Sequence, residues 1–74
     1  MSIDTISKDK KIMGQKLKYI RQGKNMTQAD IALKAGITIN YYARIERGEE
    51  NPSFEVIKGL TYALKVKSSD ILPF

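Results

Sequence analysis

The apolar residues between positions 26 and 36 recur with the period of a short helix. Three of them fall on one helical face, at a spacing of i, i+1 and i+4: Ile31, Ala32 and Ala35. Thr27 can begin this helix as its N-cap, and Asp30, three residues later, can complete a capping box. Gly36 can end the helix after about two turns, because glycine accepts the left-handed backbone conformation that such an ending requires.

A second short helix is predicted directly after this glycine, from about Ile39 to Arg47, with Thr38 as its N-cap. The residues spaced for its inward face are Tyr42, Ile45 and part of Glu46. The residues left on the outward and lateral faces are Ile39, Asn40, Tyr41, Ala43, Arg44 and Arg47. Two short helices joined by a glycine turn, the second with a free polar and basic face, have the geometry of a helix-turn-helix, which lays its second helix in the major groove of DNA.

Further helices are predicted on both sides of this pair. A first helix, at about residues 9–22, is expected to bury Ile12 or Met13, Leu17 and Ile20. Another begins after the N-cap Ser53 and carries an apolar stripe made of Phe54, Ile57, Leu60 and Leu64. A short turn at residues 69–72 closes the core. The pattern predicts an all-α domain of five helices over residues 8–74, preceded by a flexible arm at residues 1–7.

Composition restricts the chemistry that this chain can perform. The 74 residues suffice for one small domain, and they include no cysteine and no histidine. Disulfides, thiolate nucleophiles, the usual zinc ligands and the most frequent general base are therefore excluded. We expect no enzyme activity, no metal and no cofactor.

The sequence also lacks the signals of membrane insertion and export. No apolar run approaches the roughly 20 residues that a membrane-spanning helix needs. The N-terminal segment MSIDTISKDKK contains no hydrophobic stretch of the secretory type. We expect a cytoplasmic protein without membrane association.

Positive charge is concentrated near the N-terminus. The net charge is +5, and residues 1–24 alone hold seven basic side chains: Lys8, Lys10, Lys11, Lys16, Lys18, Arg21 and Lys24. A basic helix beside a DNA-reading helix suits the phosphate backbone, where neutralised phosphates release counterions. The alternative is that these lysines form a solvated face that keeps a small domain soluble.

Several short motifs stand in one order along the chain: Thr27-Gln28, Ala32, Gly36-Ile37-Thr38, Ile45-Glu46-Arg47-Gly48, Asn51-Pro52-Ser53, Ala63-Leu64 and Val66. This order resembles the Cro/CI-type, or Xre-type, helix-turn-helix family of phage repressors and small bacterial transcriptional regulators, over about residues 14–72. The resemblance implies a five-helix, lambda-repressor-like domain that binds double-stranded DNA at a short palindromic operator as a homodimer. Asn25 and Lys65 depart from the family pattern. The family usually has glycine at the position of Asn25 and often has glycine at the position of Lys65.

The predicted base-reading residues are Thr38, Ile39, Asn40, Tyr41 and Arg44. Asn40 can pair with N6 and N7 of adenine, and the Arg44 guanidinium can pair with O6 and N7 of guanine or with two phosphate oxygens. Ile39 can pack on a thymine methyl group, or it can instead contact a partner. Tyr42 is expected in the core, with its hydroxyl reaching the surface.

The residues expected to hold phosphates are Lys18, Thr27, Gln28, Arg47 and Asn51. Gln28 is the first residue after a helix N-cap, where backbone amides favour a phosphate, and the family resemblance implies the same contact. The resemblance also implies a partly buried ion pair between Glu46 and Arg21, which would join the first helix to the recognition helix.

The chain ends in an apolar segment that includes Ile71, Leu72 and Phe74. The family commonly dimerises through its last helices, so these residues are the predicted dimer interface. The alternative is that Leu72 and Phe74 fold back and cover a small core. A second functional class also stays open: an antitoxin or adaptor of the same fold that binds a co-encoded protein, which would explain the apolar Ile39.

Overall fold

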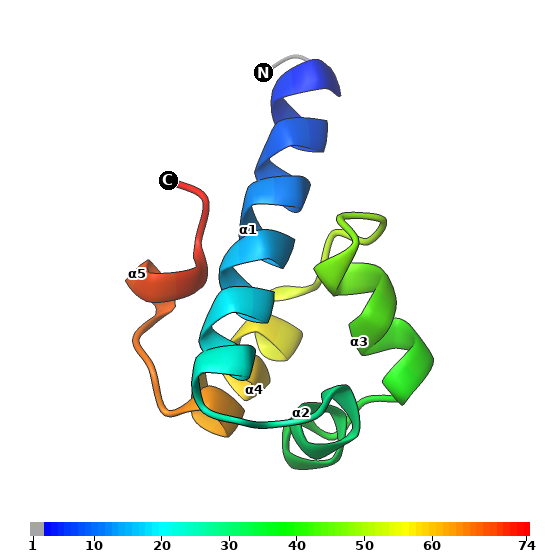
Figure 1. The fold of residues 1–74 in the computed structure, drawn as a ribbon. Helices are drawn as coiled ribbons and strands as arrows, with labels where there is room; N and C mark the ends of the chain where they lie inside the picture. The colour runs from blue at the N-terminus through cyan, green and yellow to red at the C-terminus, as the bar shows by residue number, and fades with distance from the viewer. Residues whose placement is uncertain (1–2) are drawn as a thin grey trace.

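The computed structural model describes residues 3–74, with side chains from Thr5 onward, and this part of the chain forms five helices and no strand. The helices are α1 (Ile3–Gly23), α2 (Gln28–Ala35), α3 (Ile39–Glu46), α4 (Phe54–Leu64) and α5 (Ser68–Ile71). Helix α1 is the long axis of the molecule, and it packs against α3 on one side and α5 on the other (Figure 1). Helix α2 packs against both α3 and α4. The predicted all-α, five-helix architecture is confirmed.

Helix α1 begins earlier than the sequence pattern indicated. It starts at Ile3, so residues 3–7 belong to the helix and not to an arm, while residues 1–2 lie outside the described part. The physical reason is that no glycine or proline occurs before Gly14, so nothing in the sequence ends the helix in this direction.

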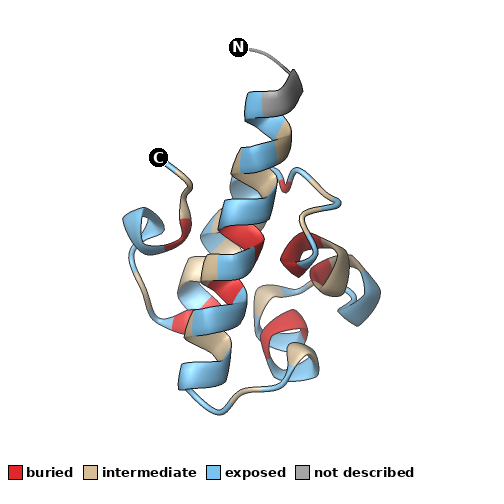
Figure 2. Cartoon of the chain, turned by 45° about the horizontal axis from the view of Figure 1, so that its top comes forward, coloured by how far each residue is buried: buried red, intermediate tan, exposed pale blue. Residues whose placement is uncertain are grey.

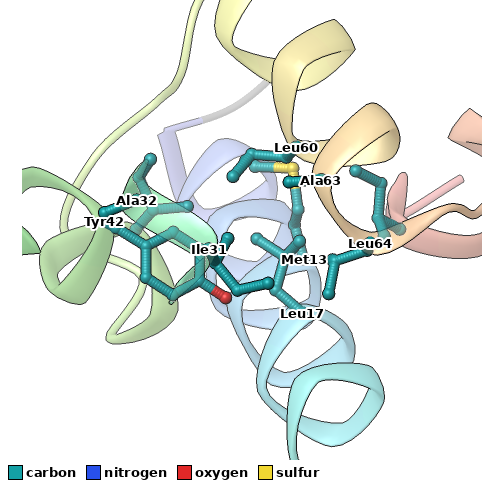
Figure 3. Close-up of a cluster of buried hydrophobic side chains, with 10 residues drawn as sticks. Met13, Leu17, Ile31, Ala32, Tyr42, Leu60, Ala63 and Leu64 are labelled. Atoms are coloured by element: carbon teal, nitrogen blue, oxygen red, sulfur yellow. The ribbon is translucent and has the colours of Figure 1, made fainter. Parts of the chain in front are cut away.

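The core is a cluster of apolar side chains contributed by all five helices: Met13, Leu17, Ile31, Ala32, Tyr42, Ile45, Leu60, Ala63, Leu64 and Ile71. Figure 2 shows the buried segments of α1, α2 and α3 turned toward the centre of the molecule, and Figure 3 shows the labelled core side chains gathered between the helices. Of the two alternatives on α1, Met13 is buried and Ile12 is 39% exposed.

One predicted core residue is on the surface. Phe54 is 81% exposed, so its assignment to the apolar stripe of α4 was wrong. It is the first residue of the helix, and the core-facing stripe begins only with the half-buried Val56 and Ile57 before it reaches Leu60. The first turn of α4 therefore extends beyond the edge of the core.

The first four helices end in the same type of turn. In each, a residue in the left-handed conformation follows the helix, and the next amide donates a hydrogen bond to a carbonyl five residues earlier. The left-handed residues are Asn25 (φ 56°), Gly36 (φ 74°), Gly48 (φ 75°) and Lys65 (φ 56°). Asn25 and Lys65 therefore adopt the same left-handed turn conformation as the two glycines.

Helices α1 and α3 approach each other most closely at Gly14. A Cβ atom at this position would lie 2.4 Å from the backbone oxygen of Glu46 and 2.6 Å from that of Ile45. Because these are backbone atoms at the end of α3, they cannot move aside as a flexible side chain would. Gly14 therefore sets the distance between α1 and the end of the recognition helix.

We predict that Gly14→Ala lowers the free energy of unfolding by about 2 kcal/mol or more, because the added methyl group forces α1 and α3 apart. The matched control is Gly23→Ala at the end of the same helix, where a Cβ would meet nothing within 4 Å. That variant should keep its stability or gain slightly. Urea unfolding followed by circular dichroism measures both, and equal stability of the two variants would contradict the close-contact argument.

Candidate nucleic-acid interface

Two threonines fix the beginnings of the helix-turn-helix. Thr27 Oγ1 accepts a hydrogen bond from the Asp30 amide at 3.0 Å, and the Thr27 amide donates to Asp30 Oδ2 at 2.9 Å. The bond from the Thr27 amide, with that from its hydroxyl, lowers the pKa of the Asp30 carboxyl. Thr38 Oγ1 caps α3 by accepting from the Tyr41 amide at 3.1 Å. The predicted caps at Thr27 and Thr38 are confirmed.

The outward face of α3 is accessible in its first turn. Ile39 is 51% exposed, and Asn40 is exposed beside it. Tyr41 is half-buried and packs against the core, so only part of its ring is free for contact with DNA. Arg44, one turn further along the helix, is also half-buried. The first turn of α3 thus offers an amide and an apolar side chain, and the second turn offers a guanidinium.

Tyr42 is completely buried, and the expectation that its hydroxyl reaches the surface was wrong. Its ring extends into the core cluster (Figure 3). The hydroxyl oxygen is buried and makes no hydrogen bond within the described part of the chain. Burial, together with the nearby Glu46 carboxylate, raises the pKa of this phenol. The side chain lies on the inward face of α3, which packs against both α1 and α2.

The ion pair between Arg21 and Glu46 is present. Arg21 Nε donates to Glu46 Oε2 at 2.6 Å, and Arg21 Nη2 donates to Oε1 at 3.1 Å. The two side chains are only 11% and 3% exposed. Burial acts to raise the pKa of the Glu46 carboxyl, but the hydrogen bonds that it accepts from Arg21 and Gln28 lower this pKa. Glu46 is therefore charged at neutral pH in a nearly dry site.

Gln28 also binds this ion pair, a contact that was not predicted from the sequence. Its Nε2 donates to Glu46 Oε1 at 3.1 Å, so the side chain turns toward the base of α3. One amide proton and the amide oxygen remain for other contacts. No local pattern could have indicated this bond, because the two residues are 18 positions apart and meet only when α2 packs on α3.

Both arginines of the recognition segment are paired with glutamates of the following turn. Arg44 Nε donates to Glu50 Oε1 at 3.0 Å, and Arg47 Nε donates to Glu49 Oε2 at 2.7 Å. The hydrogen bond from Arg47 lowers the pKa of the Glu49 carboxyl. Both arginines were predicted to contact DNA, and their pairing with the two glutamates was not predicted. Glu49 and Glu50, which directly follow Gly48, were the feature of the sequence that could have indicated these pairs.

The C-terminal residues have different environments. Ile71 is fully buried in its own chain, which removes it from the predicted dimer interface, because α5 turns it into the core against α1 and α4. Leu72 is half-buried, and its carbonyl accepts a hydrogen bond from Lys16 Nζ at 2.8 Å. Phe74 is 89% exposed, so it does not cover the core. The remaining predicted phosphate ligands, Lys18 and Asn51, are exposed.

Comparisons with known proteins agree with this geometry. Residues 17–71 match the family model described as helix-turn-helix. The chain is 38% identical over 64 residues to the control protein C.BamHI of Bacillus amyloliquefaciens. This match covers 85% of this chain and 79% of that protein. It is 37% identical over 60 residues to the immunity repressor protein of Bacillus phage phi105, and the match covers 81% of this chain but only 42% of that relative.

Among solved structures, the restriction-modification controller protein C.AhdI from Aeromonas hydrophila is similar with a TM-score of 0.84 and 30% identity. The similarity covers 86% of this chain and 97% of that one. The chain belongs to the Cro/CI-type helix-turn-helix family. It is a DNA-binding transcriptional regulator and not an enzyme. Within residues 3–74, no helix has the length and apolar character needed to cross a membrane.

We predict that Arg21→Ala lowers the free energy of unfolding by about 3 kcal/mol at neutral pH, because it leaves the buried Glu46 carboxylate without its partner. The control is Arg47→Ala, which breaks an ion pair whose side chains are 56% and 51% exposed and should leave stability almost unchanged. Thermal unfolding measures both. Equal melting temperatures for Arg21→Ala and the unaltered protein would contradict a stabilising role for the pair.

The loss of stability expected for Arg21→Ala should depend on pH. The lowered pKa of Glu46 means that its contribution is present above the ordinary carboxyl value of 4.5 and is lost as pH falls through the lowered pKa. In Arg21→Ala the carboxyl can protonate without losing a partner. The difference in the free energy of unfolding between the unaltered protein and Arg21→Ala should therefore become smaller below pH 4.5.

Proposed function

We propose that this regulator binds a short palindromic operator as a homodimer, with α3 in the major groove of each half-site. The observation that carries the proposal is the outward face of α3, where the exposed Asn40 is followed one turn later by Arg44. An amide and a guanidinium four residues apart present the two side-chain groups that best match adenine and guanine edges. The protein would act in the cytoplasm, where prokaryotic DNA is accessible.

The base contacts would come from the first two turns of α3. Asn40 would read an adenine, Arg44 a guanine, and the Thr38 hydroxyl could donate to either a base or the backbone. Ile39 would pack on a thymine methyl group, and the accessible part of Tyr41 would extend this apolar contact. The first turn of a recognition helix is the part that reaches deepest into the groove, which favours this assignment.

The phosphate contacts would surround α3. Thr27 and Gln28 lie at the N-terminus of α2, where the helix dipole favours an anion. Arg47 and Asn51 lie on the turn after α3, and Lys18 adds an exposed charge from α1. These contacts would fix the position of the domain on DNA without reading its sequence.

Dimerisation would involve the C-terminal residues of each copy. Phe74, 89% exposed, and the neighbouring half-buried Leu72 supply apolar surface at the end of the chain. Burying an aromatic ring of this kind against a second copy is favourable. Two copies related by a two-fold axis would place their α3 helices in successive major grooves, roughly 34 Å apart.

We expect a selection from a randomised duplex library, at about 150 mM salt, to enrich an inverted repeat whose half-sites are centred about one helical turn apart. Phe74→Ser should weaken dimerisation in analytical ultracentrifugation and select single half-sites without fixed spacing. Enrichment of an unpaired site by the unaltered protein would refute the dimer, and absence of any enrichment would refute sequence-specific binding.

We expect Arg44→Ala to lose about 1–3 kcal/mol of binding free energy on the selected operator and to relax the preference at one base pair. Lys18→Ala should instead weaken binding to operator and random DNA by the same factor, because a phosphate contact carries no sequence information. Fluorescence anisotropy titrations on both DNAs measure this. An equal loss on both DNAs for Arg44→Ala would move Arg44 to the phosphate-binding group.

One observation favours a second function. Ile39 is 51% exposed at the tip of α3, where a hydrogen-bonding residue would read DNA more directly. An antitoxin or adaptor of the same fold would use this apolar tip to bind a co-encoded protein. Failure of the library selection, together with a stable complex with a protein encoded beside this gene, would favour that function.

A further inference from the structure

We propose that Glu50 is a specificity-determining residue that acts by positioning Arg44 for a guanine. The inference rests on the proposed function, in which Arg44 reads a base. Glu50 would not touch the DNA itself. Its carboxylate would hold the guanidinium in the orientation that binding requires, before DNA arrives.

The guanidinium of Arg44 is held from two directions. Glu50 Oε1 accepts the hydrogen bond from Nε at 3.0 Å, along one edge of the group. The Tyr41 ring lies under it, with 5.8 Å from the guanidinium carbon to the ring centroid, within the range of a cation–π contact. The arginine therefore does not need to lose all of its rotational freedom on binding, since two contacts already restrict it.

The bond to Glu50 also selects which donors remain. A guanidinium has five N–H groups, and this contact occupies the one on Nε. The described part of the chain gives the two terminal nitrogens no hydrogen-bond partner. Their parallel N–H groups match O6 and N7 of guanine in the end-on arrangement. The other bidentate arrangement, which uses Nε, is closed while Glu50 is in place.

The charge of Glu50 acts against the competing ligands. A carboxylate beside the guanidinium repels phosphate oxygens, so Arg44 is less able to bind the backbone at random positions. An adenine would present its own amino group to the terminal donors and leave them partly unpaired. Both effects favour guanine over other contacts.

The turn after α3 explains how a residue six positions away reaches Arg44. Gly48 adopts φ 75°, and the Glu49 amide donates to the Arg44 carbonyl at 2.9 Å. This bond brings the chain back to the level of Arg44, one turn up the helix. A side chain at Gly48 would be strained, because its Cβ would lie 2.9 Å from the backbone Cα of Lys11 and because φ is positive.

The neighbouring pair provides a matched comparison. Glu49 accepts from Arg47 through both Nε, at 2.7 Å, and Nη2, at 3.3 Å, so this carboxylate occupies the donors that a phosphate would need. No ring supports Arg47 among the described residues, and the pair is exposed. Replacing either glutamate changes the net charge equally, but only Glu50 should affect discrimination between bases.

The test measures Kd by anisotropy for the homodimer on three DNAs: the selected operator, the operator altered at the base pair that Arg44→Ala identifies, and random DNA. Glu50→Ala should lower the ratio of affinities for operator and altered operator by about three- to tenfold, while binding to random DNA rises. Glu49→Ala should raise all three affinities alike and leave the ratio unchanged. Glu50→Gln, whose amide oxygen can still accept from Nε, should keep more of the ratio than Glu50→Ala.

The results distinguish the base-reading role of Arg44 from the positioning role of Glu50. If Arg44→Ala relaxes the preference at no base pair of the operator, the base-reading role of Arg44 fails, and the role of Glu50 fails with it. If Arg44→Ala lowers the ratio but Glu50→Ala behaves as Glu49→Ala does, the proposed function stands and the positioning role is overturned. If the double variant Arg44→Ala with Glu50→Ala has the ratio of Arg44→Ala alone, Glu50 acts through Arg44 as proposed.

Discussion

The buried ion pair between Arg21 and Glu46 is the interaction on which the arrangement of the DNA-binding helices depends. Its guanidinium belongs to the last turn of α1 and its carboxylate to the last residue of α3. The same carboxylate accepts from Gln28 at the start of α2, and the same guanidinium donates to the Met26 carbonyl, which precedes α2, at 2.9 Å. Three helices therefore meet at one pair. Because desolvation offsets much of the attraction within such a pair, the pair holds the helices together mainly through the large cost of leaving either buried charge without its partner.

Charge is divided unequally between the two surfaces that would meet DNA. The ion pairs of the described structure all join an arginine to a glutamate, and those of Arg44 and Arg47 neutralise the recognition segment locally. The lysines concentrated in α1 supply the excess positive charge of the chain. Attraction to the phosphate backbone would therefore come mainly from α1, whereas α3 would contribute directional contacts. Separating the two allows base contacts to be exchanged without changing the general affinity for DNA.

The sequence predicted those features that are encoded within a few residues. The caps Thr27 and Thr38 and the turn at Gly36 follow from local hydrogen bonding and backbone conformation, and the structure contains them. Phe54 and the Tyr42 hydroxyl were placed wrongly, because helical period gives the face of a side chain but not where the neighbouring helices end. The pairing of Glu50 was missed for a related reason: an acid after a helix is ordinarily a solvated residue, and its partner is determined by the turn between them.

A pre-positioned arginine has a consequence for how such a small regulator finds its site. A regulator must select its operator from a large excess of non-specific DNA, so the ratio of specific to non-specific affinity matters more than either value. An unpaired arginine on α3 would strengthen both kinds of binding, since every phosphate can accept from it. A glutamate that occupies one donor and repels phosphates weakens the non-specific kind preferentially. With few side chains available for reading bases, a short recognition helix gains discrimination by restricting the contacts that its arginine can make.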